Sequence, residues 1–319
     1  MQLLKKRLNC FNSMPFSSLS LINPAKAFLI SIFILIFSFT GCGPAREITR
    51  LSEEGESAYE AGNYQAALDH YRQLIELKEA REDEVSGKTL NRAGLSAYYL
   101  KKTSLSLQYL ERARHTDAAD ERTYAALADG YREIDNLSRE ITNLEIYVNE
   151  YPDGERIEAM RGRYFETLVE SMNWEQAYDL WPELDEETRR KESFLNGYFT
   201  VNKALGNDEQ CTRLAKKLLQ INENNTDALE WLGIKYFRRA ESRYSREMEA
   251  YERNRTHRQY AILLEAFEVI NEDFRTALNY LLKLYNIDPS PRIASYLANI
   301  YQRFENESKA RYYRQKAQE

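Results

Sequence analysis

The feature that most constrains this 319-residue chain is a short segment that recurs along it. The segment 62–71 reads Gly-Asn-Tyr-Gln-Ala-Ala-Leu-Asp-His-Tyr, and altered copies stand at 173–177, 206–211 and 273–277. Each copy begins with a turn-forming residue and lies between stretches whose apolar residues follow the three- and four-residue spacing of helices. Such self-similarity predicts an array of helix–turn–helix units that bury their faces by stacking.

Seven units can be placed in phase, and together they cover nearly all of the chain after residue 47. Their starts lie near residues 48, 87, 121, 158, 192, 226 and 291. The matching small and large apolar positions include Leu51, Gly55, Ala67 and Tyr71 in the first unit, Leu232, Gly233 and Tyr236 in the sixth, and Leu297, Ala298 and Tyr301 in the seventh. This pattern resembles the tetratricopeptide repeat, a helix–turn–helix unit of 34 residues.

The resemblance implies an all-α fold, namely a right-handed superhelical solenoid of about seven repeats over residues 48–319. Small residues would let paired helices approach closely, and Pro152 and Pro289 would end second helices. The 12 Gly and 7 Pro among 29% charged residues agree with long helices. Two features depart from the pattern: Glu140 stands where a small residue is expected, and the fourth unit has a poor first helix.

The sixth unit is longer than the others, with about 31 extra residues near 241–272. Apolar residues keep helical spacing on both sides of a polar stretch at 253–258, which predicts that both helices are lengthened into a projecting antiparallel hairpin. Its tip would be basic, with Arg253, Arg255, His257 and Arg258. The tip is interpreted either as a docking site for a partner or as a solvated turn of a structural hairpin.

The first 47 residues are predicted to be a targeting segment and a tether rather than part of the array. Basic residues precede a short apolar run, 27–39, which is too short for a membrane span. The run ends in Phe39-Thr40-Gly41-Cys42, which resembles a bacterial lipobox with Phe in place of the usual Leu. The resemblance implies a signal peptide at 1–41, a lipid on Cys42 and a tether at 42–47. The alternative is an ordinary signal peptide with an incidental Cys.

Composition and motifs disfavour most catalytic functions. The net charge of −6 opposes nucleic acid as a partner, because a phosphate backbone requires a basic surface. The three His lie in different units, and no phosphate-binding loop occurs, so neither a metal nor a cofactor is expected. Cys211 is expected to be buried and inert. Glu192-Ser193 faintly resembles the catalytic helix of α-superhelical lytic transglycosylases, which keeps a peptidoglycan lytic enzyme as an alternative.

The resemblance implies a non-enzymatic protein-binding scaffold whose first helices line a concave groove for an envelope protein or peptide. In this register the side chains expected to point into the groove are Tyr59, Asn91, Leu95, Tyr98, Asp129, Arg132, Lys203, Ile234 and Phe237. The pair Tyr98-Tyr99 is the expected anchor, because exposed aromatic residues contribute much of the binding energy.

The combined hypothesis is a lipid-anchored, periplasm-facing adaptor, on the membrane through the lipid on Cys42. Gly43, in place of Asp, implies the outer membrane, and the resemblance extends to lipoproteins of outer-membrane assembly and secretion machines. A glycan-binding lipoprotein is the first rival hypothesis, and it would need an exposed aromatic platform.

Overall fold

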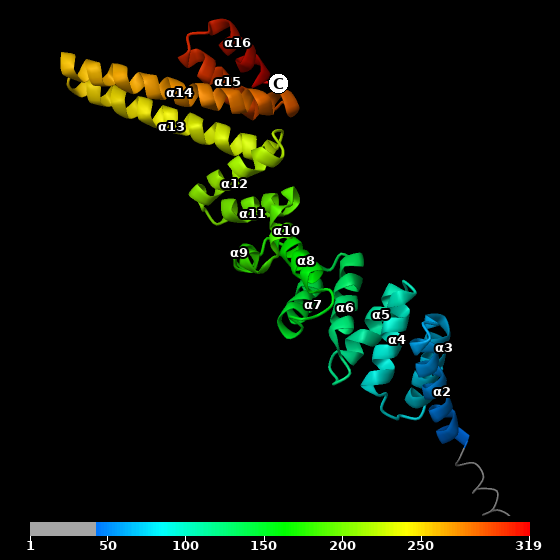
Figure 1. Cartoon of the computed structure of the whole chain (residues 1–319). Coiled ribbons are helices and arrows are strands. Elements are labelled where there is room, and N and C mark those ends of the chain that lie inside the picture. The colour runs from blue at the N-terminus through cyan, green and yellow to red at the C-terminus, as the bar shows by residue number, and fades with distance from the viewer. Residues whose placement is uncertain (1–42) are drawn as a thin grey trace, which may run out of the picture.

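The computed structural model describes residues 43–319, with side chains from Ala45 onward, so the predicted signal peptide and Cys42 lie outside the described residues. The described part is helical and has no strand (Figure 1). Its helices form seven antiparallel pairs: α2 (Gly43–Glu60) with α3 (Tyr64–Glu79), α4 (Gly87–Tyr99) with α5 (Thr103–Ala113), α6 (Glu121–Glu133) with α7 (Leu137–Glu150), α8 (Ile157–Glu170) with α9 (Trp174–Leu180), α11 (Glu192–Ala204) with α12 (Asp208–Ile221), α13 (Thr226–Arg253) with α14 (His257–Ile287), and α15 (Pro291–Arg303) with α16 (Glu307–Lys316).

The predicted all-α repeat solenoid is therefore confirmed. Six of the seven first helices begin at the expected residue or one residue before it, from Gly87 of α4 to Pro291 of α15. The first unit differs, because α2 begins at Gly43 and so includes the residues assigned to a tether. The register could be placed this closely because the apolar spacing and the turn residues agree in most units.

The turns inside the units share one geometry. Six of them contain a residue with positive φ, namely Gly62, Lys101, Asp135, Met172, Gly206 and Glu305. The next residue is the N-cap of the second helix, and at Asn63, Asn136 and Asn306 its side chain accepts a hydrogen bond from a backbone N–H of the first turn. This left-handed residue reverses the chain within three residues and makes the paired helices antiparallel.

The fourth unit is irregular in its second helix, whereas the sequence pattern placed the irregularity in its first helix. The first helix, α8, is a full 14 residues, whereas α9 has only seven. A 3-10 turn, η1 (Trp181–Glu183), follows because Pro182 cannot continue the helix, and a five-residue helix, α10 (Glu186–Arg190), comes next. Asp185 caps α10 by accepting a hydrogen bond from the backbone N–H of Thr188. The Trp181 ring stacks on the Tyr198 ring of α11, with ring centres 4.2 Å apart.

Small residues hold the helices of a unit close together, as the repeat pattern predicts. A Cβ atom on Gly94 would lie 2.5 Å from Cδ2 of Leu110, and one on Gly233 would lie 2.6 Å from Cδ2 of Leu281. Both Leu side chains have 0% exposure. Each glycine therefore leaves the space that the large residue of the second helix fills.

Stacking of the units gives a single continuous interior and an inner face. Tyr124 packs against the buried clusters of both the first and the middle units, and Leu219 joins the middle cluster to the C-terminal one. The first helices also contact one another, as α2 does with α4, α4 with α6, and α8 with α11. We call the surface formed by these first helices the inner face.

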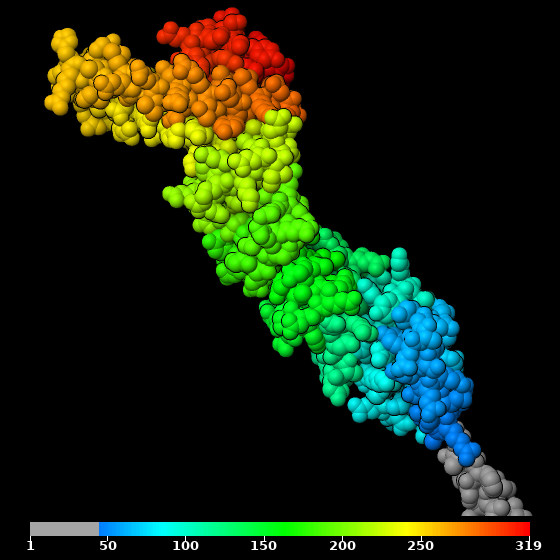
Figure 2. Space-filling model, viewed as in Figure 1, coloured from blue at the N-terminus to red at the C-terminus, as the bar shows by residue number. Residues whose placement is uncertain are grey.

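The sixth unit projects from the array as a long hairpin, as predicted. Its helices α13 and α14 have 28 and 31 residues, which correspond to lengths of about 42 and 46 Å. The far end of the hairpin extends beyond the last unit (Figures 1 and 2).

The copy of the turn segment at 273–277 is not a turn. Asp273 lies inside α14, is 3% exposed and forms two hydrogen bonds with Arg239 of α13. The chain reverses instead at 254–256, and Thr256 is the N-cap of α14.

Candidate functional site

Several of the side chains predicted to bind a partner hold the inner face together. The Tyr98 hydroxyl donates a hydrogen bond of 2.7 Å to Oδ2 of Asp129, and Arg156 donates one of 3.1 Å to the same oxygen. Burial, followed by the hydrogen bond to Asp129, raises the pKa of Tyr98. These groups join α4, α6 and the start of α8 into one polar network.

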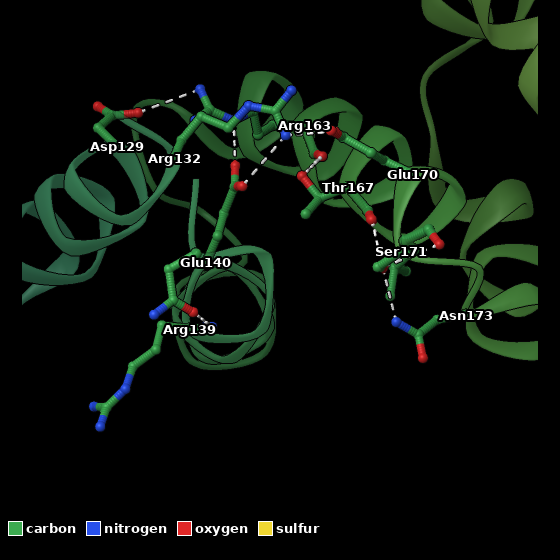
Figure 3. Close-up of polar contacts among 11 residues, drawn as sticks. Asp129, Arg132, Arg139, Glu140, Arg163, Thr167, Glu170, Ser171 and Asn173 are labelled. Atoms are coloured by element: carbon green, nitrogen blue, oxygen red, sulfur yellow. Dashed lines mark hydrogen bonds and ion pairs between the residues drawn. The ribbon is translucent and has the colours of Figure 1, made fainter. Parts of the chain in front are cut away.

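Glu140 extends this network from a second helix. Its side chain is fully buried, and Oε1 accepts a hydrogen bond of 2.6 Å from Nε of Arg163. Arg132 lies 3.6 Å from the other carboxylate oxygen and also pairs with Glu170 on α8 (Figure 3). The large acidic residue is tolerated at this small-residue position because two arginines of the inner face neutralise it.

An aromatic cluster lies at the N-terminal end of the inner face. The Tyr64 and Tyr99 rings stack at 4.3 Å, and the Arg92 guanidinium lies 4.3 Å from the ring centre of Tyr59. Tyr59 is only 8% exposed, whereas Tyr99 is 41% exposed. Tyr99 is thus the accessible member of the predicted anchor, while the hydroxyl of its neighbour Tyr98 is engaged with Asp129.

The remaining residues predicted to face the groove divide into two groups. Asn91, Leu95 and Ile234 are buried, and Asn91 donates a hydrogen bond of 3.0 Å to Oγ1 of Thr123 on α6. Lys203 is exposed on α11. Most of the predicted inner-face residues therefore join units to one another, which leaves few of them free for a partner.

A hollow lies elsewhere, between the long hairpin and the last unit. We call it the C-terminal groove, and its volume is about 740 Å³. Its lining residues come from α13, α14, α15 and the turn after α15: Phe237, Glu241, Tyr244, Phe267, Ile270, Asn271, Phe274, Asn299, Gln302, Arg303 and Glu305. Partly exposed aromatic rings share this lining with amide, carboxylate and guanidinium groups.

An ion pair forms one wall of the C-terminal groove. Nε of Arg303 donates a hydrogen bond of 3.0 Å to Glu241, and a second guanidinium nitrogen donates one of 2.9 Å. The same guanidinium lies 4.1 Å from the ring centre of Tyr244. The hydrogen bond with Glu241 raises the pKa of Arg303.

Of the residues predicted from the repeat register, only Phe237 lines this groove. Tyr244 and Phe267 belong to the extended part of the hairpin, outside the repeat register. The signal that could have identified them is their heptad step from Phe237 and Phe274, which returns a side chain to the same face of a helix.

The basic tip of the hairpin lies at the end of α13 and α14 that is remote from α12 (Figure 1). Arg253 pairs with Glu249 of the same helix. Arg255, His257 and Arg258 are exposed, and within residues 43–319 none of the three forms an ion pair.

The structure also shows the surroundings of Glu192 and Cys211, the residues weighed for catalysis or reactivity. Asn225 and Asn222 donate hydrogen bonds of 3.0 and 2.8 Å to Glu192 and lower its pKa, whereas a lytic general acid requires a raised one. Cys211 is buried, and burial raises the pKa of its thiol. In the described part of the chain, no group of three or more potential ligands could hold a metal ion, and no helix is apolar and long enough to span a bilayer.

Comparison with known proteins finds similarity only among solved structures, since no protein-family model and no curated protein matches the chain. The chain is similar to the C-terminal part of a TPR repeat-containing protein from Cytophaga hutchinsonii, with 14% identity and a TM-score of 0.44 over 83% of this chain and 93% of that one. A protein from Bacteroides ovatus matches with 19% identity and a TM-score of 0.48, over 70% and 99%. YrrB, described as a TPR protein with an unusual peptide-binding site, matches with 13% identity and a TM-score of 0.42, over 55% and 87%.

Proposed function

We propose that this protein is a non-enzymatic scaffold that binds a partner protein in the C-terminal groove and is anchored to the cell envelope by a lipid on Cys42. The observation that carries the binding proposal is the groove itself, in which the rings of Phe237, Tyr244 and Phe267 lie among polar groups that include the amides of Asn271 and Asn299. Aromatic residues supply contact area, and amides supply hydrogen bonds to a partner's backbone.

The rigidity of the array supports the same proposal. The groove walls belong to packed helices and are joined by the pair between Arg303 and Glu241, so they lose little freedom when a partner binds. Because each unit contacts only its neighbours, the last two units can carry a binding surface while the earlier ones act as a spacer.

The anchoring part of the proposal rests on the sequence Phe39-Thr40-Gly41-Cys42. With a lipid at Cys42, the array would hold its C-terminal groove at a distance from the membrane on a stiff spacer. The most concrete form of this role is an outer-membrane lipoprotein of an assembly or secretion machine.

The binding proposal can be tested by cross-linking in intact cells. A photoreactive amino acid at Asn299, on the rim of the groove, should capture a protein that mass spectrometry identifies, and Phe267→Arg should abolish that capture. The same photoreactive residue at Lys203, exposed on α11, is the matched control. Capture that occurs only from Lys203, or that persists in Phe267→Arg, would refute binding in the groove.

The anchor can be tested by metabolic labelling with a fatty acid. The wild-type chain should incorporate label and sediment with membranes, and Cys42→Ser should lose the label and appear in the soluble fraction. An unlabelled wild-type chain would contradict the lipid anchor and leave the groove proposal intact.

A further inference from the structure

The long hairpin carries a regular ladder of aromatic pairs. The ring centres of Phe237 and Phe274 lie 5.9 Å apart, and those of Tyr244 and Phe267 also lie 5.9 Å apart. The third rung, Tyr251 with Tyr260, has a separation of 5.8 Å. Successive rungs are seven residues apart on both helices, and this step returns side chains to the same face of an antiparallel helix pair.

The last unit covers one end of this ladder. Tyr296 of α15 packs against Phe237 with ring centres 5.0 Å apart, and Phe304 lies 6.3 Å from Phe274. The first rung is therefore an interface between the sixth and seventh units, and the helix seated on it, α15, is amphipathic.

The cover ends at the second rung. Arg303, the last residue of α15, lies over Tyr244. Beyond it, Tyr260 is 48% exposed and Leu264 is 47% exposed. The ten residues from Tyr244 to the turn at Asn254 correspond to about 15 Å of hairpin. In Figure 2 this part of the hairpin extends beyond the last unit.

The uncovered stretch thus continues an interface that already receives a helix inside this chain. We call Tyr244, Tyr251, Tyr260, Leu264 and Phe267 the outer ladder. A face built by heptad steps of aromatic residues matches the side-chain spacing of a third helix better than that of an extended strand, whose side chains alternate.

We propose that the outer ladder binds an amphipathic α-helix of the partner protein, whose apolar face lies on the rungs and whose acidic end lies over Arg255 in the turn at the tip. This inference rests on the proposed function, because it names the segment that enters the C-terminal groove. The charge of Arg255 favours acidic residues in the partner, since its side chain is exposed and forms no ion pair within residues 43–319.

A second copy of the chain fits this surface less well. Two hairpins in face-to-face contact would share a patch of about 15 by 20 Å, or about 600 Å² counted on both copies, whereas stable interfaces bury about 1,200–2,000 Å². A partner helix that continues into the groove adds the groove walls to the contact. It also brings the acidic residues that two identical basic tips would not offer each other.

Photo-cross-linking in intact cells with the full chain tests the proposal. The photoreactive residue is placed at Asn299 on the groove rim, at Leu264 on the outer ladder, or at Ile262, which is 41% exposed on the opposite flank of α14. Asn299 and Leu264 should capture the same partner, and the captured partner residues should recur at three- and four-residue spacing. Ile262 should capture none of it.

Matched variants separate the outer ladder from general exposure. The double variant Tyr251→Ala/Tyr260→Ala should reduce capture from Asn299 by about tenfold or more. Ile262→Ala/Val269→Ala removes two exposed apolar residues from the other flank and should change capture by less than about twofold. Arg255→Glu should weaken capture and reduce its dependence on salt. Circular dichroism checks that each variant is folded.

The outcomes distinguish the two levels of the proposal. Capture from Asn299 but not from Leu264, with no effect of the Tyr251 and Tyr260 substitutions, would keep the groove and overturn the helix. No capture from either position would overturn both. Cross-links from Leu264 to lipid, to another copy of the chain, or to partner residues with alternating spacing would overturn the helical partner.

Discussion

The central inner face and the long hairpin use the same unit in opposite ways. Along α4, α6 and α8, polar side chains pair across neighbouring first helices, and Glu140 is buried among arginines. Along α13 and α14, the third rung of aromatic residues extends past the last unit, whose cover ends at the second rung. Where each unit is covered by the next, its side chains serve stability. Where the hairpin extends beyond the seventh unit, the same stacking surface becomes available for a partner.

The largest effect should come from the covered end of the ladder. Phe274 is 1% exposed, so Phe274→Ala should lower the free energy of unfolding by about 3–5 kcal/mol through lost burial and a cavity. Tyr260→Ala, at the uncovered end, should lower it by less than about 1 kcal/mol. Urea denaturation followed by circular dichroism measures both. Equal losses would show that the outer ladder is part of the core.

The next effect compares a buried ion pair with an exposed one. Arg163→Met leaves the fully buried Glu140 carboxylate with only Arg132, at 3.6 Å, and should cost about 2–3 kcal/mol of unfolding free energy. Arg303→Met breaks a pair whose side chains are 35% and 28% exposed and should cost less than about 1 kcal/mol.

A double variant provides the control for the buried pair. Glu140→Leu/Arg163→Met should recover part of the loss, because it removes the uncompensated buried charge. If the double variant is less stable than Arg163→Met alone, the carboxylate contributes by some means other than the pairing.

A smaller effect is expected from shortening the hairpin. Replacing residues 245–266 by a Gly-Asn turn, like that at Gly62 and Asn63, removes the third rung and the basic tip. Because units contact only their neighbours, the Tm should change by less than about 3 °C, while capture of the partner from Asn299 should be lost. A large fall in Tm would mean that the projecting part stabilises the array.

The smallest effect on stability at neutral pH is expected for the buried tyrosine Tyr131. Burial, with a hydrogen bond to Glu111, raises the pKa of Tyr131 to about 12. The folded state therefore holds this proton more tightly than the unfolded state, whose tyrosine pKa is about 10. Its contribution to stability is complete below pH of about 10 and is lost as the pH rises through about 12. Thermal melts between those values should show a decline that is shallower in Tyr131→Phe, whereas identical slopes would refute the assignment.

Much of the fold could be predicted because each unit repeats the same local rules. The starts of α4, α6, α11, α13 and α15 match the predicted residues, and the long hairpin lies where the spacing placed it. The turn assigned near Asp273 was wrong for an informative reason. In the other units the chain turns at the residues that match Asp273. In the sixth unit Arg239 and Asp273 instead pair across two continuous helices, and the chain turns at 254–256.

The candidate site was harder to predict than the fold. Tyr98 and Arg132 occupy inner-face positions, but their contacts with Asp129 and Glu170 depend on how neighbouring units are staggered. A repeat pattern specifies which face a residue occupies without specifying which polar groups will meet there. That the predicted residues bind a partner, and that Cys42 carries a lipid, stay predictions.

By itself, the sequence determined the helical class, the number of units and the length of the hairpin, because apolar spacing and turn residues are local and repeat seven times. Only the tertiary structure decided which surfaces remain open. Exposure depends on where one unit stops covering another, and that limit arises from the relative lengths of α15 and the hairpin once they are packed together. The groove at Tyr244 and Arg303 exists because the shorter helix ends there.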